Sequence, residues 1–199
     1  RLPPKIAPIQ TVIIPIIKNE NSMTEIRKFL QPLLNGFENN DVRYHIDDRV
    51  KVSPGFKYNE WEMKGVPVRL EVGPRDMKSG SVFVARRDTG EKKTMDVALA
   101  ADNIVELLKE IQSNLFQQAK IFREENTFTV ESFDEFKSIL DKGGFIRCGW
   151  DGCSDSEAAV KSETKATIRC ILSNNTSQVK NCVYSGNPAM YEVIYAKAY

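Results

Sequence analysis

The chain has 199 residues, of which 41% are hydrophobic and 28% are charged, a composition that is typical of a globular protein and excludes a chain disordered throughout. Its 28 basic and 27 acidic residues give a net charge of +1, so only a local basic surface would attract nucleic acid. The longest apolar stretch, 11–17, is too short for the roughly 20 residues of a membrane span.

The first part of the chain alternates between strand and helix signals. A continuous apolar run at 11–17 is typical of a strand buried on both faces. Ser22 and Glu25 form a capping box, which predicts that a helix starts there. Further strands are predicted at 42–46, 66–72, 81–87 and near residue 94, and further helices at 56–64 and within 96–122. Residues 1–125 are therefore predicted to form an α/β domain, a mixed five-stranded sheet with three helices, the last one long and trailing.

The last part of the chain predicts a second, smaller α+β domain over 126–199. Ser132 and Glu135 form another capping box, and Gly143 is expected to end that helix. Strands are predicted at 145–150, 164–172 and 191–197. A domain of this size has a marginal core, which a bound metal would stabilise. All four cysteines fall in this part, as expected of a metal site or its remnant.

The sequence predicts no catalytic residue in this chain. His45 is the single histidine, and its alternating surroundings favour a half-buried strand residue. A cysteine nucleophile would need it as a base, yet every cysteine lies in the other predicted domain. No phosphate-binding loop, dinucleotide-binding motif or hydrolase motif occurs. The neighbouring Asp47 and Asp48 would point to opposite faces of a strand, which favours a cap or a turn over a metal site.

Several motifs resemble one enzyme family. In the first part they are LPPKIAP (2–8), VIIP (12–15), DDR (47–49), PGFK (54–57), WEMKGVP (61–67) and LEVGPRD (70–76). In the second part they are ETKATIRC (163–170), GNPA (186–189) and YAKAY (195–199). Over essentially its whole length, the chain resembles the anticodon-binding domain and C-terminal domain of class II prolyl-tRNA synthetases of the archaeal and eukaryotic type.

The resemblance implies that the chain is a C-terminal fragment, in keeping with its lack of an initial Met. The family's catalytic domain would precede it and charge proline onto tRNA(Pro), using ATP and magnesium. The implied partners are that tRNA and the protein's own catalytic domain, in a cytoplasmic homodimer with no membrane contact. The carboxylate of Tyr199 is expected to reach toward the catalytic domain.

The resemblance also implies which residues contact RNA. The family's anticodon contacts fall on Glu62, Arg69, Arg75 and either Lys92 or Lys93, because the turn before the lysines is one residue longer than in some relatives. From their charge, and not from the resemblance, Lys92 and Lys93 with Arg86 and Arg87 would neutralise phosphates nearby. Two alternatives stay open. Either these charges form a solvated sheet edge, on which Arg69 only pairs with Glu71 or Glu62, or the chain is a synthetase-like protein-interaction module without tRNA binding.

A zinc site is only partly matched. Cys148 and Cys153 match the first cysteine pair of zinc-containing members, and Cys182 matches the first member of the second pair, whose partner position holds Ser185. Structural zinc requires four thiolate or imidazole ligands. Cys170 is a weak candidate for the fourth ligand, but its mid-strand position favours a buried free cysteine. We therefore expect that zinc is not bound.

Overall fold

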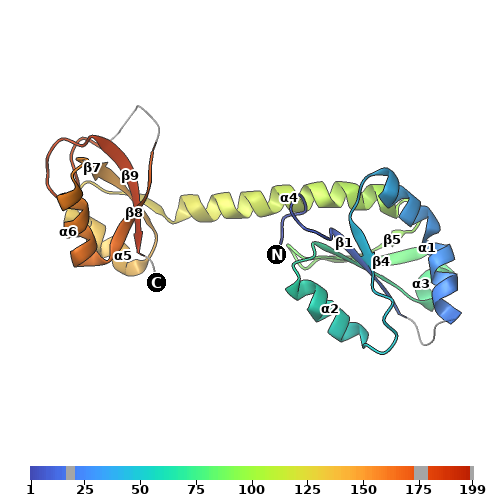
Figure 1. The fold of residues 1–199 in the computed structure, drawn as a ribbon. Coiled ribbons are helices and arrows are strands. Elements are labelled where there is room, and N and C mark those ends of the chain that lie inside the picture. The colour runs from blue at the N-terminus through green and yellow to red at the C-terminus, as the bar shows by residue number, and fades with distance from the viewer. Residues whose placement is uncertain (17–20, 173–178, 198–199) are drawn as a thin grey trace. The chain divides into compact units, whose positions relative to one another are not determined.

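The computed structural model describes residues 1–16, 21–172 and 179–197, and the chain divides into two compact units, Arg1–Gln117 and Gln118–Tyr199 (Figure 1). The division falls inside one long helix, eight residues before the domain boundary that the sequence predicts at 125. Within the described ranges, no helix is both long and apolar enough to cross a membrane. Tyr199 lies outside the described residues.

The first unit is built on a mixed five-stranded sheet, as predicted. Its strands are β1 (Thr11–Pro15), β2 (Tyr44–Ile46), β3 (Val68–Val72), β4 (Ser81–Arg86) and β5 (Lys92–Asp96), in the spatial order β2-β1-β3-β4-β5. Strand β1 is parallel to β2 and β3, whereas β4 is antiparallel to β3 and β5. Its helices are α1 (Asn21–Asn39), α2 (Pro54–Met63), α3 (Pro74–Ser79) and α4 (Ala100–Glu125).

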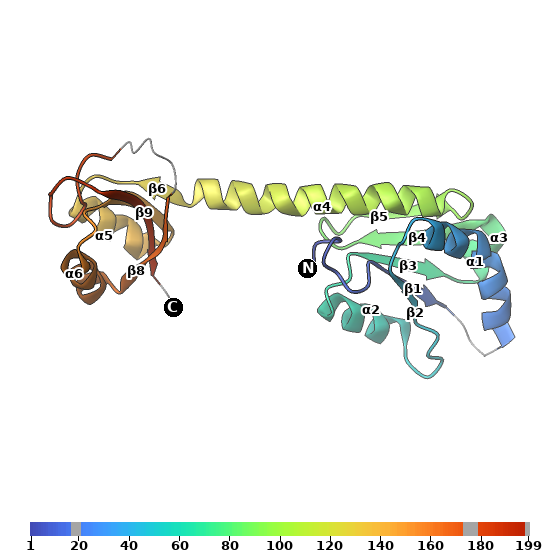
Figure 2. The same ribbon diagram turned by 45° about the horizontal axis from the view of Figure 1, so that its top comes forward.

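The two faces of this sheet are covered unequally. Helices α1 and α4 pack on one face, where Ile13, Leu70 and Val84 join the main core. Helix α2 lies on the opposite side of the sheet (Figure 2) and buries Trp61 against Val12 of β1. On that second face the residues of β5 are exposed. We call this second face, which carries Arg69 of β3, Ala85 of β4 and Lys92 of β5 in direct register, the open face.

One expectation for the first unit needs correction. Helix α3 adds a fourth helix between the strands predicted at 66–72 and 81–87, where the sequence analysis predicts no helix. It has six residues and buries none of them, so its sequence contains no helical repeat of apolar residues from which it could be predicted. Helix α1 spans Asn21–Asn39 and so lies where the capping box at Ser22 predicts a helix, while the residues directly before it lie outside the described ranges.

The second unit is an α+β sandwich of one sheet and two helices. Its elements are β6 (Thr127–Thr129), α5 (Phe133–Lys142), β7 (Phe145–Trp150), α6 (Ser154–Thr164), β8 (Ala166–Ile171) and β9 (Tyr191–Lys197), with the sheet order β6-β7-β9-β8. The predicted cap is confirmed, because the Ser132 hydroxyl accepts a hydrogen bond from the Glu135 backbone N–H at 3.3 Å. Helix α6 and strand β6 were not predicted. Helix α6 is only weakly amphipathic and β6 has three residues, so neither shows a clear repeat of apolar residues in the sequence.

Candidate nucleic-acid interface

Helix α2 and strand β3 together bring Glu62 and Arg69 to the open face. The Ser53 hydroxyl caps α2 by accepting from the Phe56 backbone N–H at 3.4 Å, and Pro54 opens the first turn. Gly65 then turns the chain with φ +79°, and a Cβ there would lie 2.7 Å from the Leu2 side chain. The chain therefore reverses within a few residues, so the last turn of α2 faces the start of β3.

A buried ion cluster around Asp47 fixes α2 to the sheet. The Asp47 side chain is 1% exposed and accepts hydrogen bonds from the Arg49 guanidinium at 2.8 and 2.7 Å and from Trp61 Nε1 at 2.8 Å. Lys57, also buried, places its ammonium 3.5 Å from the Asp47 carboxylate and donates to the Asp47 carbonyl oxygen at 2.9 Å. Burial alone would raise the pKa of Asp47, but these donors outweigh it and hold that pKa well below its usual value.

The structure refines the expectations for Asp47, Asp48 and His45. Asp47 does accept from the Arg49 backbone N–H at 3.4 Å, as a turn residue would, but its main partners are side chains. Asp48 is exposed and pairs with Arg27 at 3.0 Å. His45 is exposed and not half-buried, because α2 covers only one side of its ring, with the Trp61 ring centroid at 4.9 Å.

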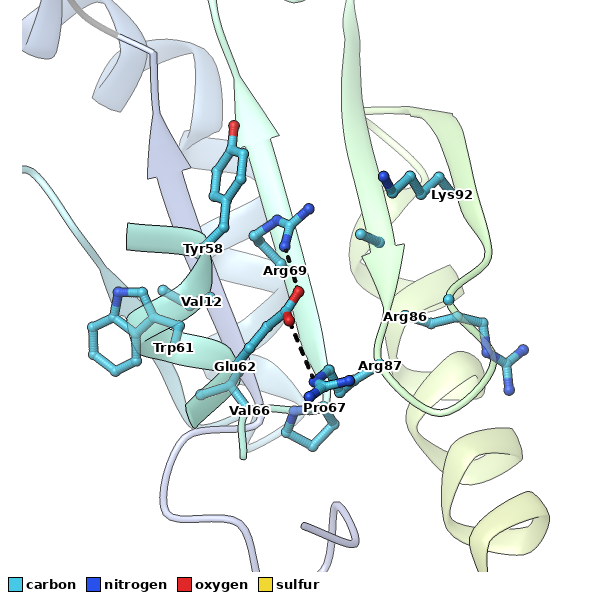
Figure 3. A pocket seen from close by; sticks show the side chains of 12 residues that line it. Val12, Tyr58, Trp61, Glu62, Val66, Pro67, Arg69, Arg86, Arg87 and Lys92 are labelled. Carbon is cyan, nitrogen blue, oxygen red and sulfur yellow. Dashed lines mark hydrogen bonds and ion pairs between the residues drawn. The ribbon is translucent and has the colours of Figure 1, made fainter. Parts of the chain in front are cut away.

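Arg69 is held at the centre of the site by three partners. Its Nε donates to Glu71 at 3.0 Å and its Nη1 donates to Glu62 Oε1 at 3.2 Å, while its guanidinium lies 4.0 Å from the Tyr58 ring centroid (Figure 3). The Tyr58 hydroxyl donates to the other Glu71 oxygen at 2.6 Å. Burial and this hydrogen bond raise the pKa of Tyr58, so its hydroxyl stays protonated and acts as a donor. Arg69 therefore has a defined geometry before any ligand binds.

Basic side chains from β4 and β5 complete the site. Lys92 is exposed and shares the open face with Arg69 through the register Arg69–Ala85–Lys92. Arg87 Nε lies 3.9 Å from Glu62 Oε2. Figure 3 shows Glu62 between Arg69 and Arg87. These four residues, with Tyr58, line a cavity of about 110 Å³.

Three other basic residues from the sequence analysis are less closely tied to this site: two of them do not line the cavity, and Arg86 lines it but pairs elsewhere. Lys93 pairs in register with Val84, which places it on the face covered by α1 and α4. Arg75 is exposed in α3, beyond the far end of β3, and does not line the cavity. Arg86 points away from Glu62 (Figure 3) and donates to the buried Asp88 at 2.7 and 2.8 Å. Burial alone would raise the pKa of Asp88, but the hydrogen bonds from Arg86 and from Asn114 outweigh it and lower that pKa to about 2.

Sequence reasoning missed Tyr58 and named Glu71 only in the alternative in which Arg69 pairs on a solvated face. A signal was present, because Tyr58 and Glu62 are four residues apart on one helix and therefore share a face. Arg69 and Glu71 alternate along one strand and also share a face. The contact between the two faces depends on how α2 packs on the sheet, which local spacing does not specify.

The cysteines of the second unit do not assemble a ligand set. Cys148 and Cys182 are buried, whereas Cys153 and Cys170 are exposed. The expectation that Cys170 is buried is wrong, because the register of β8 shifts between Ile168 and Cys170. Among the described residues, no three His, Cys, Asp or Glu side chains are grouped to hold a metal ion. Ser185 instead donates to the Asp151 carboxylate at 2.6 Å.

Comparisons with known proteins agree with this architecture. The family model described as "Anticodon binding domain" matches residues 10–110, and the model described as "Prolyl-tRNA synthetase, C-terminal" matches residues 133–199. The chain is 45% identical to the proline–tRNA ligase of Cytophaga hutchinsonii over 199 residues, covering 100% of this chain and 40% of that relative. It is 41% identical to the proline–tRNA ligase of Porphyromonas gingivalis over 198 residues, again covering 100% of this chain and 40% of the relative.

A solved structure is similar over the same extent. The prolyl-tRNA synthetase from Cryptosporidium parvum, crystallised with L-proline and AMP, matches with a TM-score of 0.87 and 32% identity. The match covers 100% of this chain and 42% of that chain. The chain therefore spans about two fifths of the length of the relatives that it matches.

Proposed function

Because the chain belongs to the family of anticodon-binding domains, whose model matches about half of it, we propose that it is the C-terminal, tRNA-reading portion of a proline–tRNA ligase. The observation that carries this proposal is Glu62, a half-exposed carboxylate held between Arg69 and Arg87 on the open face. The match of residues 133–199 to the prolyl-tRNA synthetase C-terminal model supports the choice of proline.

The chemistry of this site fits the anticodon of proline tRNA. Proline codons begin with two cytosines, so the anticodon presents two guanines. Unpaired anticodon bases are read on their exposed edges, and guanine offers N1–H and N2–H donors that a carboxylate such as Glu62 accepts. Arg69 orients that carboxylate and supplies donors for guanine O6 and N7. Lys92, which is exposed on the same face, would neutralise phosphates, a contact that positions RNA without reading its bases.

The remaining proposed contacts lie outside the cavity. Arg75 and Lys93 are basic and exposed, so they remain proposals for RNA contact. Of the two lysines, Lys92 is preferred, because it shares the open face with Arg69.

A binding titration tests the proposed function. The chain is expected to bind proline tRNA more tightly than the same tRNA whose two anticodon guanines are replaced by adenines, since each well-matched base contact contributes about 1–3 kcal/mol. Filter binding or fluorescence anisotropy at one fixed salt concentration measures the ratio of the two affinities. A protein-interaction module without tRNA binding would show no affinity for either RNA.

The wider proposals concern the whole protein. We propose an enzyme of the archaeal and eukaryotic type, supported by the similarity to the Cryptosporidium parvum structure, although the sequence relatives named above are bacterial. In the whole enzyme, a catalytic domain would bind ATP and magnesium, and the chain alone would activate no proline. A cytoplasmic homodimer, and a role for the Tyr199 carboxylate near the catalytic domain, belong to the same proposal.

We also propose that the second unit folds without zinc. The Asp151 carboxylate accepts hydrogen bonds from the Ser185 hydroxyl at 2.6 Å, the Ser156 hydroxyl at 3.0 Å and the Cys153 backbone N–H at 3.1 Å. These bonds join the loop after β7 to the loop that holds Ser185. A metal bound by Cys148, Cys153 and Cys182 would join the same two parts of the chain. The hydrogen bonds of Asp151 would therefore replace the connection that the metal provides.

Metal analysis tests the zinc proposal. The purified protein is expected to contain well under one zinc per chain, because Ser185 is a poor substitute for the fourth thiolate. The Ser185→Cys variant is expected to gain zinc, and Ser185→Ala, which removes the hydroxyl without adding a thiol, serves as its control. Stoichiometric zinc in the unaltered protein would contradict the proposal.

A further inference from the structure

We propose that Arg87 reads a guanine base together with Glu62, in addition to the residues that the family resemblance implies. The inference rests on the proposed function and adds a specificity-determining residue to the same site. Its starting point is an unpaired donor: Arg87 Nε is buried, yet it has no hydrogen-bond partner among the described residues. Buried polar groups are nearly always hydrogen-bonded, so such an atom requires an explanation.

The position of Arg87 is fixed by the backbone. Its N–H donates to the Pro67 carbonyl oxygen at 2.9 Å, which ties the end of β4 to the segment between α2 and β3. The side chain is 35% exposed and lines the cavity. The neighbouring Arg86 also lines the cavity, but its side chain is only 11% exposed and its guanidinium is paired with Asp88. Arg87 is therefore held in place by its backbone, while its guanidinium stays available to a ligand.

Glu62 offers the matching unfilled group. Its Oε1 accepts from Arg69, whereas its Oε2 faces Arg87 Nε at 3.9 Å. That separation is too long for an N–H···O hydrogen bond, which spans about 2.7–3.2 Å. Arg87 and Glu62 thus form an ion pair at the cavity, drawn as a dashed line in Figure 3, but no hydrogen bond joins the donor to the acceptor. A ligand that both accepts from Arg87 and donates to Glu62 would satisfy the two groups together.

Guanine has this pattern on its Watson–Crick edge. O6 is an acceptor, and N1–H and N2–H beside it are two adjacent donors. Uracil presents one donor between two acceptors, and neither adenine nor cytosine presents two adjacent donor groups on that edge. Arg87 would donate to O6 while Glu62 accepts from N1–H and N2–H. The pair Arg87–Glu62 therefore selects guanine, whereas a cation that only neutralises phosphate would select no base.

The decisive measurement compares base discrimination with salt dependence. The affinities of the unaltered chain and its variants are measured for proline tRNA and for the adenine-substituted tRNA over a range of salt concentrations. Arg87→Ala is expected to weaken binding of proline tRNA by roughly 10- to 100-fold and to leave binding of the adenine-substituted tRNA nearly unchanged. Arg87→Lys keeps the charge but loses the planar fork, so it should lose discrimination with the salt dependence unaltered.

Two lysines provide matched controls. Lys92→Ala should weaken binding of both RNAs by the same factor and flatten the salt dependence, as expected for a phosphate contact. Lys109→Ala, which removes an exposed lysine of helix α4 outside the site, should change neither the affinity nor the discrimination. Thermal melting monitors folding, and if Arg87→Ala does not fold, Arg87→Lys carries the comparison alone.

Three results would overturn the inference. Equal weakening of both RNAs by Arg87→Ala, with a flatter salt dependence, would make Arg87 a phosphate contact. Unchanged affinities would remove Arg87 from the interface, while the proposed function would stand on the discrimination of the unaltered chain. Absence of discrimination in the unaltered chain would reject the proposed function itself, and the role of Arg87 with it.

Discussion

Replacing Asp47 by Ala is expected to destabilise the first unit by about 3–5 kcal/mol, the usual cost of removing one member of a buried ion pair. Lys57 is 2% exposed and would lose its only nearby carboxylate among the described residues. The indole N–H of Trp61 would lose its acceptor as well. Urea unfolding monitored by tryptophan fluorescence measures the change in the free energy of unfolding.

The adjacent carboxylate is a matched control for this prediction. Asp48 is 53% exposed and pairs with a half-exposed Arg27. Exposed ion pairs contribute little, so Asp48→Ala should cost less than about 1 kcal/mol. If Asp47→Ala cost no more than Asp48→Ala, the Asp47 cluster would not be what holds α2 on the sheet.

The Asp47 cluster also makes the stability of the folded state depend on pH. The pKa of Asp47 is lower in the folded state than in the unfolded state, where it is about 3.9. As pH falls through that value, the unfolded state takes up the proton first, so folding loses the contribution of Asp47. Stability is therefore expected to decline below about pH 4 in the unaltered chain, and the decline should be shallower in a chain with Asn at this position.

The fold follows from the sequence where the apolar pattern is strong. Strands β7 and β9 have the predicted bounds, 145–150 and 191–197, because each contains a run of apolar and aromatic residues that is typical of a strand. Elements without such a pattern were missed: α3 buries no residue, and α6 has little amphipathic contrast. Short elements are positioned by the tertiary structure around them, which a single sequence does not encode locally.

The site was predictable in its residue types but not in its geometry. The family resemblance indicated Glu62 and Arg69, and the structure brings them within 3.2 Å of each other. It did not distinguish Lys92 from Lys93, because only the register of β5 against β4 decides which lysine shares the face of Arg69. Arg86 and Arg87 have different environments because successive side chains at the end of β4 point to opposite faces of the sheet.

Arg69→Ala is expected to lower affinity for proline tRNA by about 1–3 kcal/mol and to relax the preference for guanine. The sequence left open that Arg69 only pairs with Glu62 or Glu71 on a solvated face. The structure contains both pairs, but the Arg69 side chain is 12% exposed and stacks on Tyr58, so the face is not fully solvated. Without Arg69, the Glu62 carboxylate would lose the donor that orients it.

Glu62→Gln tests the other half of the same pair. The variant keeps the shape of the side chain but replaces one acceptor oxygen by an NH₂ donor, which would face the N–H groups of guanine. Affinity for proline tRNA should therefore fall by about 1–3 kcal/mol, while affinity for the adenine-substituted tRNA should hold or rise. Glu60→Gln, which alters a carboxylate on the same helix paired with Arg49 and Lys64, is the control and should keep the preference for guanine.

The double variant decides whether Arg69 and Glu62 act as one unit. If Arg69 works by holding Glu62, the loss in Arg69→Ala/Glu62→Gln should be smaller than the sum of the two single losses, since residues in contact are coupled by about 0.5–3 kcal/mol. Additive losses would instead assign each side chain its own contact with the base. Retention of the guanine preference in Glu62→Gln would remove the carboxylate from base recognition, and Arg69 would then be a structural partner of Tyr58 and Glu71.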